Sequence, residues 1–230
     1  MFDRFFGGPT HKLERAFEDA ARHAPEGPLA DYYRAGLADL DTPANGATLL
    51  AIDLETDGLD LGSSTILEAG CIALRRGMIA SDSARRIRFR SDSPLDPEAV
   101  VIHRITDDAA AAARPFEEAL AEVLRECAGK VLVAHFAEIE AGFLDAACRL
   151  VYGTGLVAPF ICTMQLEARW FPRTRAADRL RLGKLRAQYG LPTYRAHDGL
   201  TDALACGELL LAQLAHAGRE NVPLAELLRR

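Results

Sequence analysis

Residues 47–58 read ATLLAIDLETDG, and this stretch indicates the class of fold. Its first six residues form a short uninterrupted apolar run, which is typical of a β-strand buried on both faces. Asp53 and Glu55 follow directly, before Thr56-Asp57-Gly58 turns the chain. Because side chains at i and i+2 of a strand share a face, the two carboxylates point the same way. Two buried like charges are unfavourable unless a cation compensates them, whereas a solvated strand end would carry them without one.

Apolar runs elsewhere extend the prediction to a whole domain. Further strands are expected at Thr65–Leu74, Arg85–Arg90 and Val131–Ala134, where Arg85–Arg90 alternates with period two like a strand with one exposed face. Helices are expected at Pro115–Ala128, from about Ala137 to Val151, and at Gly199–Ala215. Early strands followed by alternating helices and strands predict an α/β domain with a mixed β-sheet flanked by helices.

The chain divides by composition into three parts. Residues 1–46 predict a helical N-terminal appendage, 47–217 the main domain, and 218–230 a C-terminal tail. The appendage holds six of the chain's 16 aromatic residues: Phe2, Phe5, Phe6, Phe17, Tyr32 and Tyr33. We expect these rings to dock onto the main domain; a partner-binding arm is the alternative.

Composition excludes several classes of protein. The 230 residues are 49% hydrophobic and 26% charged, which excludes disordered, collagen-like and coiled-coil chains. The longest stretch without a charge, 150–166, is broken by glycines and a proline and is shorter than the about 20 residues of a membrane helix. The first residues lack the pattern of a secretory signal. We therefore expect no membrane partner and a cytoplasmic location.

Charge and cysteine usage limit the chemistry further. The net charge of −6 argues against a protein that coats polyanions. It permits a nucleic-acid enzyme, because a carboxylate-lined metal site is itself acidic. The five cysteines are scattered without a C-x-x-C pair, so they predict buried, reduced side chains rather than disulfides or a zinc site.

Two further acidic clusters lie at predicted strand and helix ends. Residues 134–140, AHFAEIE, follow the strand Val131–Ala134, and 197–203, HDGLTDA, begin the helix Gly199–Ala215. Four carboxylates brought to one edge of an α/β sheet are what a two-metal phosphoryl-transfer site requires. Hard oxygen ligands hold Mg²⁺ or Mn²⁺, and a nearby neutral imidazole can take a proton from the attacking water.

These blocks resemble the three ordered motifs of the DEDDh 3′→5′ exonucleases, the proofreading epsilon-subunit-like (DnaQ-like) branch of the ribonuclease-H-like superfamily. The motifs are Asp53-x-Glu55, the His135…Glu140 block, and His197-x-x-x-x-Asp202. They are separated by about 85 and about 60 residues, as in the family. The resemblance covers roughly Leu49 to Ala215 and implies a ribonuclease-H-like fold.

The resemblance also implies roles for particular residues. It implies that Asp53, Glu55, Glu140 and Asp202 bind two divalent ions, Mg²⁺ or Mn²⁺, and that His197 is the general base. Thr56, Leu59 and His103 become candidates for binding the terminal nucleotide, with Leu59 as a wedge against its base. The reaction implied is hydrolysis of phosphodiester bonds at a nucleic-acid 3′ end with release of nucleoside monophosphates.

The second motif departs from the family pattern. The family usually has His-Asn-x-x-Phe-Asp, whereas this chain has Phe136 and Glu140 in place of the asparagine and the aspartate. Glutamate reaches over an ångström further than aspartate, so its carboxylate must fold back or bind through water. Asp145 is an alternative ligand, although the register favours Glu140.

Three functions remain open from the sequence. Single-stranded DNA is the favoured substrate, RNA is the alternative with the same chemistry, and a metal-poor binding module is the rival of another class. Proofreading would need a polymerase on another subunit, while repair or turnover would not. The basic stretch Arg169–Arg186 is either a solvated helix face or a track for nucleic-acid phosphates.

Overall fold

A computed structural model describes residues 9–91, 100, 104–171 and 177–229. Its centre is a five-stranded sheet with the strand order β3-β2-β1-β4-β5. The strands are β1 (Thr48–Thr56), β2 (Ile66–Arg75), β3 (Met78–Arg88), β4 (Val131–Ala134) and β5 (Phe160–Cys162). The sheet is mixed, because β1, β2 and β3 pair antiparallel whereas β4 pairs parallel with both β1 and β5.

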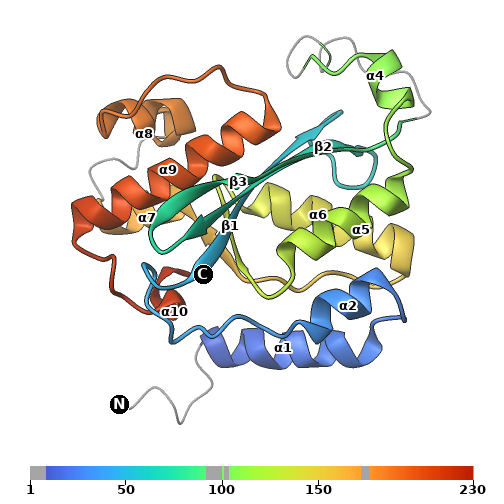
Figure 1. Cartoon of the computed structure of the whole chain (residues 1–230), viewed down its shortest axis with the longest axis horizontal. Coiled ribbons are helices and arrows are strands. Elements are labelled where there is room, and N and C mark those ends of the chain that lie inside the picture. The colour runs from blue at the N-terminus through green and yellow to red at the C-terminus, as the bar shows by residue number, and fades with distance from the viewer. Residues whose placement is uncertain (1–8, 92–99, 101–103, 172–176, 230) are drawn as a thin grey trace.

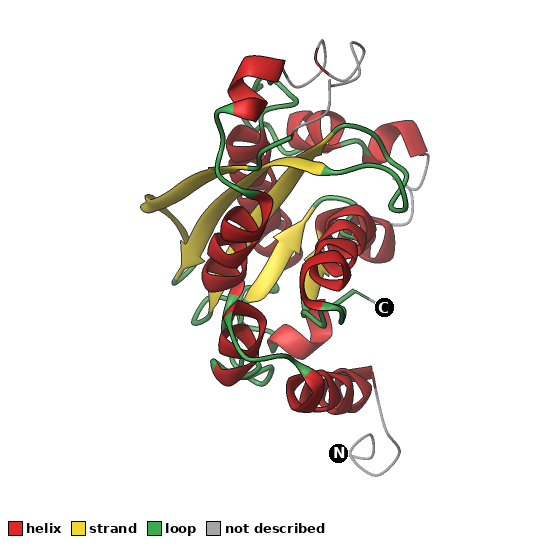
Figure 2. Cartoon of the chain, turned by 90° about the vertical axis from the view of Figure 1, so that its right-hand side faces the viewer, coloured by secondary structure: helices red, strands yellow, loops and turns green. Residues whose placement is uncertain are grey.

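Helices cover both faces of the sheet (Figures 1 and 2). The described helices are α1 (Pro9–His23), α2 (Pro28–Arg34), α4 (Asp107–Ala111), α5 (Phe116–Cys127), α6 (Glu138–Tyr152), α7 (Thr163–Trp170), the 3₁₀ helix η2 (Ala177–Leu180), α8 (Leu182–Gln188), α9 (Gly199–Ala217) and α10 (Leu224–Leu227). The predicted α/β fold with a mixed sheet flanked by helices is thereby confirmed, and an N-terminal helical part is present.

Alternation along β1 decides which helix faces the acidic residues. Ile52 and Leu54 pack into the apolar cluster that includes α5 and α6. Ala51 packs instead into the cluster that includes α9. Because successive side chains of a strand point to opposite faces, Asp53 and Glu55 lie on the α9 side. The strand that buries the core therefore also aims both carboxylates at one helix.

The first turn of α9 touches the sheet without intervening side chains. Gly70 of β2 lies so close to Gly199 that a Cβ on Gly70 would stand 2.0 Å from the carbonyl carbon of Gly199. Only glycine permits that approach of the two backbones. Asp198 begins the helix, and its Oδ1 accepts a hydrogen bond of 3.0 Å from the backbone N–H of Thr201. These contacts bring the start of α9 over Asp53, whose β2 partner is Gly70.

The N-terminal helices dock onto the domain through aromatic rings. Phe17, Tyr32 and Tyr33 are buried in the same apolar cluster as α5 and α6. The hydroxyl of Tyr32 donates to the carbonyl of Val157 at 3.1 Å, and the N–H of Val157 donates to the Tyr33 hydroxyl at 2.9 Å. The expected docking is confirmed for these three rings; Phe2, Phe5 and Phe6 lie outside the described residues.

The C-terminal segment packs against the chain that leads into β1. The N–H of Leu224 donates to the carbonyl of Thr42 at 3.0 Å, and Leu224 and Leu227 are buried with Leu40 and Ala44. The division of the chain at 46/47 and 217/218 stays a prediction.

One strand was not predicted from the sequence. β5 is only three residues long, too short for a periodic pattern, and it lies inside the uncharged stretch 150–166. All five cysteines are free and buried, as expected. No helix in the described part of the chain has the length and apolar character needed to cross a bilayer.

Candidate active site

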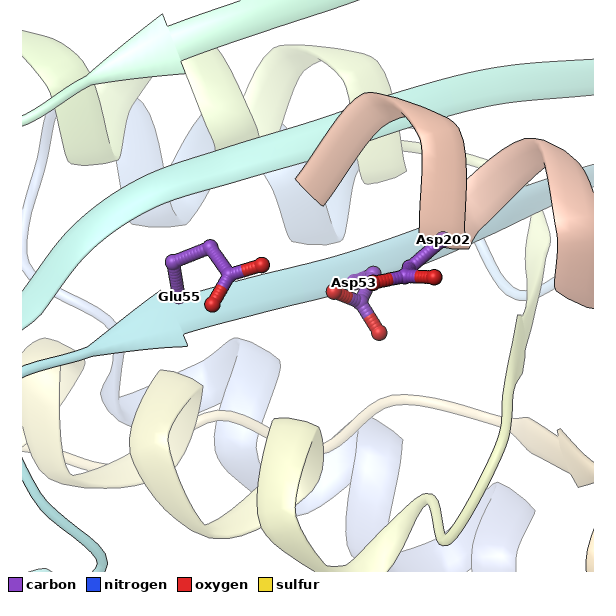
Figure 3. Close-up of side chains that lie close together, drawn as sticks. All are labelled: Asp53, Glu55 and Asp202. Carbon is purple, nitrogen blue, oxygen red and sulfur yellow. The ribbon is translucent and has the colours of Figure 1, made fainter. Parts of the chain in front are cut away.

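Three carboxylates meet where β1 passes beneath the start of α9 (Figure 3). Asp53 and Glu55 come from β1, and Asp202 comes from the first turn of α9. One oxygen from each lies within 4.8 Å of the oxygens of the other two. Glu55 is only 8% exposed, and Asp53 and Asp202 are partly buried. The structure thus brings Asp202 to two residues that lie 147 and 149 positions before it in the sequence.

The electrostatics of this group favour a bound cation. Burial raises the pKa of Asp53 well above its usual value, and the charges of Glu140, Asp202 and Glu55 raise it further. Burial and the charge of Asp202 raise the pKa of Glu55 to about 8. Carboxylate oxygens are hard ligands, and a divalent cation among them would relieve both the desolvation and the repulsion. The donor set therefore fits a divalent metal ion.

Glu140 lies close enough to Asp53 for its charge to raise the pKa of Asp53, but its carboxylate oxygens are not within 4.8 Å of those of all three other residues. It is 4% exposed in the first turn of α6, and burial raises its pKa to about 8. Its Oε2 is buried and finds no hydrogen-bond partner among the residues that the structure describes. A buried carboxylate oxygen without a partner is costly unless a ligand satisfies it. Glu140 thus fits the position of a further metal ligand.

Asp145, the alternative ligand, is engaged elsewhere. Its Oδ2 accepts a hydrogen bond of 2.8 Å from Nε of Arg149, and its Oδ1 accepts one of 3.0 Å from the N–H of Leu156. These contacts fasten the segment that follows α6. The geometry therefore favours Glu140 over Asp145.

His197 is exposed in the segment that leads into α9. Its backbone adopts a positive φ of 64°, which is uncommon for a residue other than glycine. Its N–H donates to Oδ2 of Asp202 at 2.6 Å, and the N–H of Asp198 donates to the same oxygen at 3.3 Å. Asp202 thus holds the backbone of His197 beside the carboxylate group.

The structure describes two of the three residues that are predicted to bind the terminal nucleotide. Thr56 ends β1, and its hydroxyl donates to the carbonyl of Gly58 at 2.6 Å. Leu59 is 77% exposed beyond the same strand end, a position open to a substrate base. His103 lies outside the described residues.

An ion-pair network beside the site was missed from the sequence. Glu68 of β2 is 1% exposed and accepts from Nη1 of Arg86 at 2.5 Å and from Nε of Arg88 at 3.0 Å. Nη2 of Arg86 also donates to both oxygens of Asp198, at 2.8 and 2.9 Å. Arg86 and Arg88 are exposed residues of β3, yet both pair with this buried carboxylate. The available signal was Glu68 itself, a lone charge in an apolar run.

His135 is engaged in hydrogen bonds at both of its ring nitrogens. The carbonyl of Leu180 can only accept, so Nε2 of His135 donates to it at 2.8 Å, and Nδ1 then accepts from the hydroxyl of Thr163 at 2.8 Å. Burial lowers the pKa of His135 to about 4. Next to it, Phe136 is 46% exposed with a φ of 69°.

The basic stretch Arg169–Arg186 is not uniformly exposed. Arg179 and Arg181 are exposed, whereas Arg186 is only 3% exposed. Residues 172–176, with Arg173 and Arg175, lie outside the described part. Contact of the exposed arginines with nucleic-acid phosphates stays a prediction.

Comparison with known families decides the class of this site. A family model described as Exonuclease (RNase_T) matches residues 50–210, which include all three motifs. The chain belongs to this exonuclease family. It is 32% identical over 172 residues to DNA polymerase III subunit epsilon of Treponema pallidum, covering 74% of this chain and 78% of that relative. It is 27% identical to DNA polymerase III PolC-type of Streptococcus pneumoniae, of which it spans only 11%.

Solved structures agree with this family. Exonuclease X in complex with 5′ overhanging duplex DNA has a TM-score of 0.58 and 25% identity, covering 76% of this exonuclease and 97% of that chain. The nuclease domain of 3′hExo, a DEDDh family member bound to rAMP, has a TM-score of 0.65 and 16% identity, covering 80% and 96%. The chain is therefore a 3′–5′ exonuclease with a ribonuclease-H-like fold, as the resemblance implied.

Substitutions at Glu140 test its role as a ligand. Glu140→Asp is expected to weaken metal binding and lower the rate, because the shorter side chain withdraws the carboxylate by more than the roughly 0.2 Å tolerance of a metal bond. Glu140→Gln, which keeps the shape and removes the charge, should be worse. Titrating activity with Mg²⁺ and Mn²⁺ measures both effects. The matched control is Asp145→Asn, which should be nearly silent; an inactive Asp145→Asn with an active Glu140→Gln would make Asp145 the ligand.

The raised pKa values predict an unusual pH dependence of stability. Between about 4.5, the ordinary pKa of a glutamate, and about 8, the folded metal-free protein holds more protons on Glu55 and Glu140 than the unfolded chain does. The free energy of unfolding should therefore fall as pH rises through this window. Thermal unfolding in EDTA at pH 5, 6.5 and 8 measures the slope. Mg²⁺ should restore stability most at pH 8, and a metal-free melting temperature that rises across the window would contradict the site.

Proposed function

We propose that this exonuclease removes nucleotides one at a time from the 3′ end of single-stranded DNA and releases nucleoside monophosphates. The observation that carries the proposal is the group formed by Asp53, Glu55 and Asp202, beside which Glu140 has an oxygen without a hydrogen-bond partner in the described part of the chain. The polymerase subunit of Treponema pallidum, which aligns with most of the chain, supports DNA as the substrate.

The same carboxylates would hold the metal ions of the reaction. Asp53, Glu55, Glu140 and Asp202 together suit two divalent ions, Mg²⁺ or Mn²⁺, since all their donor atoms are carboxylate oxygens. Bound there, such ions would neutralise the scissile phosphate and stabilise the charge on the leaving oxygen.

The other residues act directly on water and substrate. His197, when neutral, accepts a proton from the attacking water through its exposed imidazole. The hydrogen bonds from its backbone and that of Asp198 to Asp202 fix its distance from the carboxylates. Thr56, Leu59 and His103 bind the terminal nucleotide, with Leu59 against its base. Location in the cytoplasm stays a prediction, and a proofreading role would require a polymerase as partner.

One assay tests the substrate and the reaction together. Single-stranded DNA and RNA of the same sequence, labelled at the 3′ end, are incubated with Mg²⁺, Mn²⁺ or EDTA. Labelled mononucleotide is expected from DNA with either metal and not with EDTA, and a parallel 5′-labelled strand should shorten stepwise. Faster release from RNA would make the protein an exoribonuclease. Binding without release in any metal would make it a binding module.

A further inference from the structure

Arg186 is a buried arginine on α8 that the reaction itself does not use. It is 3% exposed, although its neighbours Arg179 and Arg181 are exposed. A buried guanidinium is costly unless its donors are satisfied, so its partners reveal what it holds together. Those partners come from two other segments of the chain, α9 and the segment 191–198.

The first partners of Arg186 lie on α9. Its Nη1 donates to the backbone carbonyl of Ala205 at 2.7 Å, and its Nη2 donates to Oε2 of Glu208 at 2.8 Å. Ala205 lies one helical turn beyond Asp202, and Glu208 lies a further turn on. The guanidinium is therefore fixed on the helix that supplies a carboxylate to the active site.

The other partners of Arg186 lie on the segment that carries His197. Its Nη2 also donates to the carbonyl of Pro192 at 2.9 Å, and its guanidinium carbon lies 4.5 Å from the centre of the Tyr194 ring. The hydroxyl of Tyr194 in turn donates to Oε1 of Glu208 at 3.1 Å. Pro192 is thereby linked to α9 through the planar guanidinium of Arg186, and Tyr194 is linked to it both through its own hydroxyl and through the contact of its ring with Arg186.

Two residues, Arg195 and Ala196, separate this attachment from His197. Beyond them the backbone N–H of His197 is held by Asp202. Between the two attachments lies a pocket of about 70 Å³ lined by Arg186, Tyr194, Ala196, Asp202 and Ala205 among others. The hydrogen bonds of Arg186 to Pro192 and of His197 to Asp202 therefore lie on either side of this pocket.

We propose that Arg186 is a positioning residue that holds the segment 191–198 against α9 so that His197 faces the reacting water. This inference rests on the proposed function, in which His197 is the general base. Without Arg186 the segment keeps the hydrogen bonds of His197 to Asp202 and of Tyr194 to Glu208, but loses the contacts of the guanidinium with Pro192 and with the Tyr194 ring. A misplacement of about 1 Å can cost about 10²-fold in rate, so the expected effect is on turnover rather than on DNA binding.

A double-mutant cycle tests the proposal. Arg186→Met should lower kcat by about 10- to 100-fold with KM for single-stranded DNA nearly unchanged. In a His197→Ala background the same substitution should have no further effect, because a residue that acts through His197 cannot act once the imidazole is gone. Arg186→Lys should remain impaired, since one ammonium cannot hold Ala205, Pro192 and Glu208 together. The matched control is Arg75→Met, which removes an exposed arginine paired with Asp82 and should leave kcat unchanged.

Each outcome of the cycle has a defined meaning. Equal losses of kcat in the wild-type and His197→Ala backgrounds, or a folded Arg186→Met with normal kcat, would overturn the proposal. If Arg186→Met does not fold, Tyr194→Ala takes its place in the cycle. This variant removes the ring that lies against Arg186 and the hydrogen bond to Glu208, and it should lower kcat by about tenfold. A wild-type protein without hydrolysis, or a His197→Ala variant with full activity, would instead refute the proposed function.

Discussion

Asp53→Asn is expected to abolish hydrolysis and to stabilise the metal-free protein. Asp53 has its pKa raised by burial and by four neighbouring carboxylates, so its charged form is unfavourable in the absence of a cation. The amide keeps the shape, removes one charge and relieves the repulsion. The rate should fall by roughly 10³-fold or more, because the substitution removes a metal ligand. Activity assays and thermal unfolding in EDTA measure the two effects on the same preparation.

The opposite signs of the two effects make this prediction specific. A substitution that simply damaged the fold would lower both activity and melting temperature. Asp202→Ala should be equally inactive but less stabilised, because Asp202 also accepts the N–H groups of His197 and Asp198. The control Asp82→Asn alters an exposed carboxylate paired with Arg75 and should change neither. An Asp53→Asn enzyme that kept most of its rate would remove Asp53 from the site.

His197→Ala is expected to lower the rate by roughly 10²- to 10⁴-fold with little change in affinity for single-stranded DNA. The imidazole accepts a proton in the reaction but does not hold the carboxylate group together, so metal and DNA should still bind. The rise of rate with pH that deprotonation of an imidazole produces should be missing from the variant. Single-turnover rates at several pH values, together with DNA binding in Ca²⁺, measure both properties.

The control for this variant is a histidine far from the site. His11→Ala changes an exposed residue of α1 and should leave the rate and its pH dependence intact. A His197→Ala protein that retained the wild-type pH profile would assign the base to another group. A variant that bound DNA much more weakly would show instead that His197 contacts the substrate.

The main strands and helices could be predicted because their apolar patterns are long. β1, β2 and α9 each bury a continuous or periodic run, so the sequence of apolar residues alone indicates them. β5 could not be found in this way, because three residues in an uncharged stretch carry no period. Its strand conformation comes from pairing with β4, which is a tertiary effect.

The carboxylates of the candidate site could be predicted from the sequence, whereas the arginine contacts around them could not. Asp53 and Glu55 could be placed on one face, because a strand has a period of two, and their meeting with Asp202 followed from the topology of the sheet. The contacts of Arg86 and Arg186 could not be predicted. Both arginines lie in stretches rich in basic residues, and only the partners Glu68 and Glu208, distant in sequence, distinguish them from surface charges.

The close approach of Gly70 and Gly199 fixes the N-terminal end of α9 directly against the backbone of β2. There the helix rests on strand backbone, whereas farther along it rests on side chains such as Cys206 and Leu210. Changes of side-chain volume in that apolar layer are therefore expected to displace the far end of α9 more than the end that carries Asp202. On this expectation, substitutions in the apolar layer beneath the far end of α9 leave the separation between Asp202 and Asp53 nearly unchanged, whereas any side chain at Gly70 would alter it.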